Sequence, residues 1–212
     1  MTEAFCGLIM AAVLIKRVPS EEGAMSVTLE PGDVFLTRGY SFISRAIRFF
    51  TRDAGEKRTK VNHVGVVVEA GEITTAVAVE ALSRVKRHRL WSQYGPPKKD
   101  GVAVYRSTNL TPDEVEIIVA TAERQVGKKY GYLKIAAHFL DWLLEGAYVF
   151  RRLVPDGKYP ICSWLVAHAF SEAGKHFNVE PGAATPDDIW DFIEANPDRY
   201  TEVRPLVPLR EE

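Results

Sequence analysis

The stretch YPICSWLVAHAF at residues 159–170 is an almost wholly apolar run that predicts a buried helix with Cys162 at its start. Pro160 suits the first helical position, and Gly174 suits the end of the last turn. The first N–H groups of a helix have no partners within it, and their partial positive charge lowers the pKa of a cysteine placed there. The stretch therefore predicts either a reactive thiolate or a cysteine that only packs in the core, since free cysteine is commonly buried.

The composition limits the classes of protein to which this chain can belong. Its 212 residues, 46% hydrophobic and 26% charged, are enough for one sizeable core. A formal net charge of −1 gives no overall attraction to nucleic acid, so we expect no nucleic-acid partner. The two cysteines lie far apart and the five histidines are scattered, which predicts neither a disulfide framework nor a metal site. We expect no metal and no organic cofactor.

An apolar run at residues 5–15 stands apart from the rest of the chain. It is too short to span a bilayer and follows Glu3, where an export signal would carry positive charge. Three interpretations stay open: an extra packing segment, a poor export signal, or translated sequence upstream of a start at Met25. We expect residues 1–28 to lie outside the core, residues 29–212 to form a single domain, and no integral membrane span. A cytoplasmic location is favoured, with export through this segment still open.

The remainder alternates between short β-branched runs and helical patterns. Turn residues and β-branched side chains predict strands at residues 34–36, 61–69, 74–82 and 101–106. Apolar periodicity, twice preceded by a Thr-Pro-Asp cap, predicts helices at residues 41–51, 111–127, 133–149 and 185–193. Residues 203–208 form either a terminal strand or an extended tail. This order predicts an α+β fold in which a small antiparallel sheet packs against a helical group that contains the Cys162 helix.

His63 and Glu80 are the candidates to complete a site with Cys162. If the hairpin folds symmetrically about residues 71–72, His63 faces Glu80, with Cβ atoms about 5 Å apart. A carboxylate in that position holds one imidazole nitrogen while the other points at a thiol. A slip of one residue would turn Glu80 to the other face, so a solvated Glu80 is the competing interpretation.

The other histidines carry weaker signals. His168 lies six residues into the Cys162 helix, nearly on its opposite side, and is predicted to be a packing residue. The sequence identifies no partner for the remaining three, which are His88, His138 and His176.

Several short motifs together resemble a known family. In chain order they are PGDV (31–34), an amphipathic stretch, NHVGVV (62–67), Glu80-Ala81, GKKYGY (127–132) and YPICS (159–163). This order resembles the permuted papain-like cysteine amidases of the YiiX/YebB/YaeF type, relatives of the NlpC cell-wall peptidases. In that family the histidine strand precedes the cysteine helix, the reverse of papain. The resemblance covers residues 29–192.

The resemblance implies a circularly permuted papain-like fold and a cysteine hydrolase that cleaves an amide or peptide bond through a thioester. It places the nucleophile at Cys162, the general base at His63 and the third polar residue at Glu80. The substrate-binding residues expected with it are Tyr130, Ser163 and Tyr159. The implied substrate is a small peptide, a peptidoglycan-like molecule or an acylated compound.

Two other functions stay open on the same scaffold. One is an acyltransferase or a lipid or thioester hydrolase, although the Asn-Cys-Glu-His-Phe signature of the lecithin–retinol acyltransferase relatives is absent. The other is an inactive binding module. The bulky Tyr159, Ile161 and Trp164 stand where the family often has smaller or more polar residues around the cysteine, which leaves the shape of the pocket open.

Overall fold

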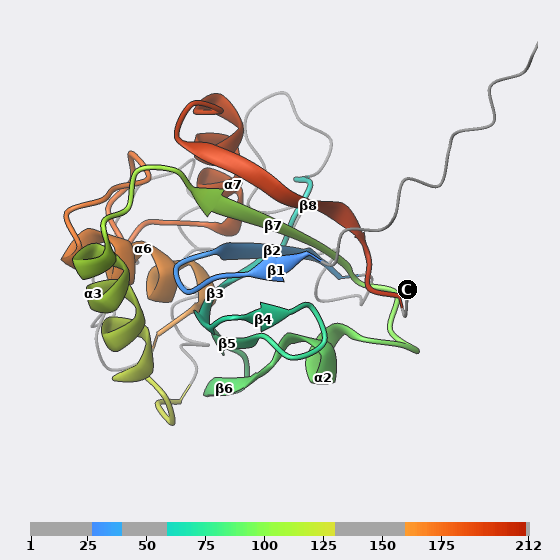
Figure 1. The fold of residues 1–212 in the computed structure, drawn as a ribbon. Coiled ribbons are helices and arrows are strands. Elements are labelled where there is room, and N and C mark those ends of the chain that lie inside the picture. Colours follow the sequence, from blue (N-terminus) through green and yellow to red (C-terminus); the bar gives the residue numbers. More distant parts are fainter. Residues whose placement is uncertain (1–26, 40–58, 130–159, 211–212) are drawn as a thin grey trace, which may run out of the picture.

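Figure 1 shows the computed structural model, which describes residues 27–39, 59–129 and 160–210 as an α+β fold. The strands of the main sheet are β2 (Val34–Arg38), β3 (His63–Glu69), β5 (Val77–Ala81), β6 (Val85–Arg89), β7 (Gly101–Ser107) and β8 (Tyr200–Pro208). They lie in the order β6-β5-β3-β2-β7-β8, and each neighbouring pair is antiparallel. A small second sheet pairs β1 (Thr28–Leu29) with β4 (Gly71–Glu72).

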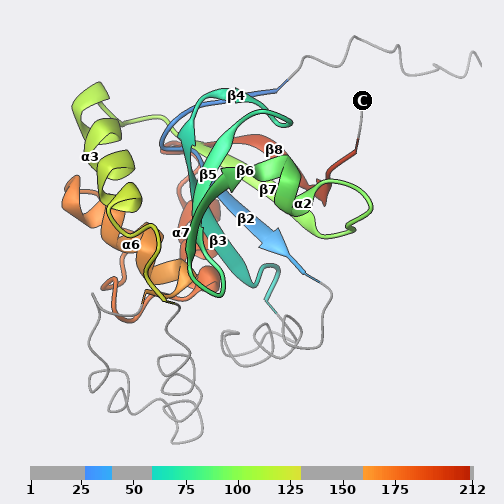
Figure 2. The same ribbon diagram turned by 90° about the horizontal axis from the view of Figure 1, so that it is seen from below.

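Helices cover both faces of the main sheet (Figures 1 and 2). On one face lie α3 (Pro112–Glu123), α6 (Cys162–Glu172) and α7 (Pro186–Ala195), which bury the side chains of Leu36, Val64 and Val66. The short α2 (Leu90–Tyr94) packs on the other face against Phe35, Val67 and Ala78. Because both faces are covered, the central strands are apolar from Val34 to Leu36 and from Val64 to Val68 instead of alternating with polar residues.

The predicted helix caps are confirmed for α3 and α7. Thr111 accepts a hydrogen bond from the Glu114 N–H, and the Glu114 carboxylate accepts one from the Thr111 N–H. Thr185 and Asp188 make the same reciprocal pair at the start of α7. Each pair satisfies backbone donors that a helix start leaves open.

The bounds of the Cys162 helix differ in one respect from the sequence prediction. Gly174 does end α6, with φ +72°, and the Lys175 N–H donates to the Phe170 carbonyl at 2.9 Å, as in a Schellman motif. At the other end, α6 begins at Cys162 with Ile161 as N-cap. Pro160 therefore precedes the cap and does not occupy the first helical position. Cys162 holds that position itself.

The sequence interpretation missed four elements and shortened or lengthened others. It assigned nothing to the two-residue strands β1 and β4 or to α2, and it missed β6 because VKRHR has the composition of a solvated loop. The strand predicted at residues 74–82 begins at Val77, since residues 73–75 form a turn. The alternative left open for residues 203–208 is decided in favour of a strand, because they belong to β8.

Some predictions fall outside the described residues. These are the apolar run at residues 5–15, the helices at residues 41–51 and 133–149, His138, and the substrate-binding candidates Tyr130 and Tyr159. The division at residue 28, the single domain and the cytoplasmic location also stay predictions. Within the described ranges, no helix is both long enough and apolar enough to cross a membrane.

Candidate active site

His63 and Glu80 meet, but not through the predicted register. The structure pairs Val66 with Val79, which places Glu80 opposite Gly65, whereas symmetric folding of the hairpin would have placed it opposite His63. The register prediction is therefore wrong by two residues. The difference arises because residues 73–75 form a turn and the ladder has a bulge between Val67 and Glu69. An even slip keeps both side chains on one face, so Glu80 reaches His63 along the diagonal.

Gly65 provides the space for this diagonal contact. A Cβ atom at residue 65 would overlap the ring of Phe35 and lie 2.9 Å from the Glu80 Cβ. Because Phe35 belongs to the fully buried core, its ring has little room to move aside. A glycine at this position of β3 therefore leaves room for the Phe35 ring of β2 and the Glu80 side chain of β5.

Replacing Gly65 with Ala is expected to destabilise the protein by about 1–3 kcal/mol, because the added methyl overpacks the space between Phe35 and Glu80. Gly101→Ala is the matched control, since its added Cβ would meet Leu206 only at 3.4 Å and beyond. Urea unfolding of both variants measures the difference. Equal stability of the two variants would contradict this account of Gly65.

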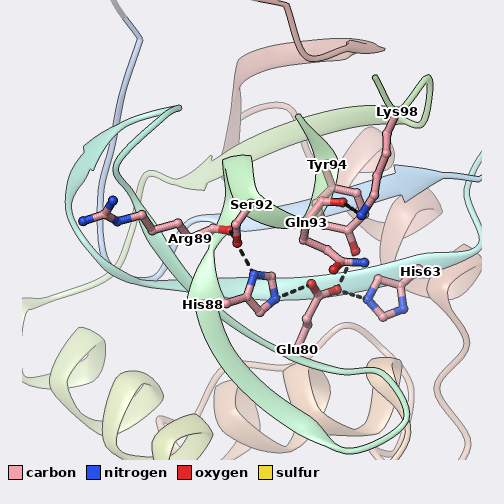
Figure 3. A network of polar contacts seen from close by, with 8 residues as sticks. All are labelled: His63, Glu80, His88, Arg89, Ser92, Gln93, Tyr94 and Lys98. Carbon is pink, nitrogen blue, oxygen red and sulfur yellow. Dashed lines mark hydrogen bonds and ion pairs between the residues drawn. The ribbon is translucent and has the colours of Figure 1, made fainter. Parts of the chain in front are cut away.

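The Glu80 carboxylate accepts hydrogen bonds from three side chains, although it is wholly buried (Figure 3). Its Oε2 atom accepts from His63 Nε2 and from the Tyr94 hydroxyl, the latter at 2.5 Å. Its Oε1 atom accepts from His88 Nε2 at 2.6 Å. The competing interpretation of Glu80 as a solvated residue is therefore wrong.

The contacts keep Glu80 ionised. Burial alone would raise the pKa of this carboxyl, but the positive charges and hydrogen bonds of His63 and His88 lower its pKa below the ordinary value. An ionised carboxylate only accepts hydrogen bonds, so the proton in the short bond to His63 belongs to Nε2. This fixes the tautomer of His63 and leaves Nδ1 as the ring nitrogen available to another group.

The side chain of Cys162 is the other group that acts on the His63 imidazole. Burial lowers the pKa of His63, but the negative charges of the Cys162 thiolate and Glu80 and the hydrogen bonds to both raise it above its ordinary value. The imidazole thus lies between a thiol and a carboxylate, which favours its protonated form. Such an arrangement lets the thiol give up its proton and stay paired with an imidazolium.

Cys162 lies where β3 meets the first turn of α6, and its side chain is 6% exposed. The N-cap residue Ile161 makes no side-chain cap bond to the first N–H groups of α6. The Cys162 N–H is therefore a candidate donor to an oxyanion that forms beside the sulfur.

Tyr94 is a functional candidate that the sequence interpretation missed. Its hydroxyl donates to Glu80, and its ring packs edge-on against Phe35 with centroids 6.0 Å apart. Tyr94 belongs to α2, a helix that the sequence pattern does not predict. The only indication of Tyr94 in the sequence is that the short run LWSQY, as a helix, would place this tyrosine on an otherwise apolar side.

Ser163 and His168 have other contacts. Ser163, which was expected to contact the substrate, is buried. Its Oγ donates to the Ala184 carbonyl at 2.6 Å, and this hydrogen bond connects α6 to the segment before α7. A role of Ser163 toward substrate stays a prediction. His168 stacks on Trp164 with centroids 4.6 Å apart and lies 3.8 Å from a Glu172 oxygen, in keeping with a packing residue.

The described residues offer no cluster of metal ligands. Across residues 27–39, 59–129 and 160–210, no group of three or more His, Cys, Asp and Glu side chains is arranged to hold a metal ion.

Known proteins include a distant structural neighbour of this chain. No family model matches the chain, and no curated protein does. Among solved structures, the chain is similar to the crystal structure of metalloprotein yiiX from Escherichia coli O157:H7, with 21% sequence identity and a TM-score of 0.46. The match covers 68% of this chain and 66% of that one. The candidate site is therefore identified from the contacts of its own residues and not from this similarity.

Proposed function

We propose that the chain is a cysteine hydrolase that cleaves an amide or peptide bond through a thioester intermediate. In this proposal Cys162 is the nucleophile, His63 is the general base, and Glu80 orients the imidazole. The observation that carries it is the position of His63, which is hydrogen-bonded to a buried carboxylate and whose pKa is raised by the side chain of a cysteine at a helix start.

The proposed reaction follows from the donors and acceptors at these three residues. His63 Nδ1 takes the proton of the Cys162 thiol, and the thiolate attacks the acyl carbon of the substrate. The carbonyl oxygen becomes an oxyanion, toward which the Cys162 N–H is directed as donor. His63 then protonates the leaving amine, and the thioester remains. Finally His63 takes a proton from water, the hydroxide releases the acid, and the thiol is restored.

The chain order supports a permuted papain-like fold for this hydrolase. The histidine strand β3 comes before the cysteine helix α6, which is the order of the family that the sequence resembles. We infer from that resemblance that the substrate is a small peptide, a peptidoglycan-like molecule or an acylated compound. Acyl transfer would use the same three residues, with an alcohol or amine in place of water.

A substrate panel tests the proposed function. Purified protein is assayed against short peptide p-nitroanilides, muropeptide fragments and acyl esters, with Cys162→Ser and Cys162→Ala as controls. We expect amide cleavage that both variants abolish. Activity confined to lipid esters in detergent would favour the lipid hydrolase instead. Amide cleavage that persists in Cys162→Ala would exclude this cysteine as nucleophile.

The reactivity of the thiol can be measured without knowing the substrate. At mildly acidic pH, iodoacetamide is expected to label Cys162 at least about tenfold faster than Cys6, because an imidazolium stabilises the thiolate. His63→Ala should remove this difference. Peptide mass spectrometry after timed quenching gives both rates in one sample, and labelling in urea supplies the unfolded reference. Equal rates in the folded wild-type protein would contradict a thiolate at Cys162 and favour the binding module.

A further inference from the structure

A second imidazole contacts Glu80 and has no part in the reaction described above. His88 lies on β6 opposite Ala78 of β5, so it is on the same face of the sheet as Glu80 (Figure 3). His88 Nε2 lies 2.6 Å from Glu80 Oε1, and His88 Nδ1 lies 2.9 Å from the Arg89 carbonyl oxygen. The His88 side chain is 16% exposed. Both of its ring nitrogens therefore have a defined partner.

The two partners of His88 fix its protonation state. A carbonyl oxygen only accepts hydrogen bonds, so Nδ1 must donate to Arg89. The Glu80 carboxylate also only accepts, so Nε2 must donate to Oε1. Glu80 itself stays ionised because His63 and Tyr94 donate to its other oxygen. A neutral imidazole carries one N–H, and these contacts need two, so both hydrogen bonds form only when His88 is an imidazolium.

We propose that His88 is a positioning residue that stays protonated throughout the reaction, so that the working unit is a chain of four groups: Cys162, His63, Glu80 and His88. The inference rests on the proposed function, since it assigns His88 a part in the same reaction. When the thiolate forms, the unit holds two anions and two cations, and its charges cancel. Without the His88 cation, the unit would carry a net negative charge both before and after the proton moves from Cys162 to His63, and a net charge in a largely buried site is costly.

The charged groups around His88 agree with this assignment. Burial lowers the pKa of His88, but the hydrogen bond and charge of Glu80, together with the Arg89 carbonyl, raise it above its ordinary value. The like charge of Lys86, on the same strand, acts against them. His63 lies across Glu80 from His88 and is the other cation of the unit.

The other polar groups near this face have partners of their own. From α2 and the loop that follows, Tyr94 donates to Glu80, and the Lys98 ammonium donates to the Gln93 carbonyl (Figure 3). Arg87 alternates to the opposite face of β6, where it binds Glu69 and Glu123. Of the carboxylates in these contacts, Glu80 is therefore the one that is hydrogen-bonded to His88.

His88→Gln separates the charge of this residue from its hydrogen bond, because a Gln amide can still donate to Glu80 Oε1 but is neutral. Loss of a nearby cation disfavours the thiolate. The midpoint of the rise in the Cys162 alkylation rate with pH is therefore expected to move up by about one pH unit, the size that one unit charge roughly 10 Å away has at an effective dielectric constant of about 20. His176→Gln, the matched control, should leave the midpoint unchanged. A residue that only packs would leave the midpoint of His88→Gln unchanged as well.

The outcomes distinguish this inference from the proposed function. Fast wild-type alkylation that depends on His63, together with an unshifted midpoint in His88→Gln, would overturn the role of His88 alone. Slow alkylation that does not depend on His63 would overturn the proposed function and the role of His88 with it. The wild-type protein provides a check that needs no variant, since ¹⁵N spectra should show both ring nitrogens of His88 protonated at pH 7. A neutral single tautomer there would overturn the proposal.

Discussion

His63→Gln is expected to lower kcat/KM on an amide substrate by about 10⁴-fold or more, because a glutamine amide can bond to Glu80 but cannot take up a proton and return it. The reaction needs two proton transfers, one from the thiol and one to the leaving amine, and His63 is the group that lies against the thiol. Steady-state kinetics on the best amide of the panel measure the loss. Unchanged circular dichroism would show that the variant still folds.

A double variant makes this expectation sharper. If Cys162 and His63 act as one unit, Cys162→Ala alone should lower activity to the same floor, and the double variant should be no slower than either single one. His168→Gln is the matched control, since His168 stacks on Trp164 and pairs with Glu172 outside the proposed unit. Retention of a tenth of the wild-type activity by His63→Gln would rule out His63 as the general base.

The parts of the fold that the sequence predicts are those where local pattern and packing agree. Runs of β-branched residues identify β3 and β7, and Thr-Pro-Asp caps identify the starts of α3 and α7. In contrast, β6 is an edge strand whose middle is polar, so it offers no alternating apolar pattern. Its pairing with β5 decides its structure, and that pairing depends on contacts distant in the sequence.

The candidate site, like the fold, could be predicted only where the local sequence pattern and the packing agree. The contact between His63 and Glu80 is confirmed although the register is wrong, because a slip by an even number of residues preserves the face. His88 and Tyr94 could not be found, because their contacts with Glu80 require both the β5–β6 register and the position of α2. A sequence can indicate that a buried carboxylate needs donors, but not which elements supply them.

Glu80→Gln is expected to lower kcat/KM by about 10²- to 10⁴-fold, because an amide cannot accept at both ends of the side chain. One of the three donors, His63, His88 or the Tyr94 hydroxyl, would then face an NH₂ group. The same mismatch should destabilise the fold by about 1–3 kcal/mol, since the three donors meet at a wholly buried side chain. Glu172→Gln is the matched control, because Glu172 also lies near a histidine but on the surface. Urea unfolding and kinetics on the same preparations separate the two effects.

The stability difference between the wild type and Glu80→Gln should depend on pH in a defined way. The pKa of Glu80 is lowered in the folded protein, so its contribution is present above its ordinary pKa of about 4.3 and is lost as the pH falls. The pKa values of His63 and His88 are raised, so their contributions are present below about 6.5 and are lost as the pH rises. The difference should therefore be largest between these two limits and shrink on both sides. A difference that does not vary between pH 3 and pH 9 would show that Glu80 acts on stability by packing alone, and not as the charged centre of the site.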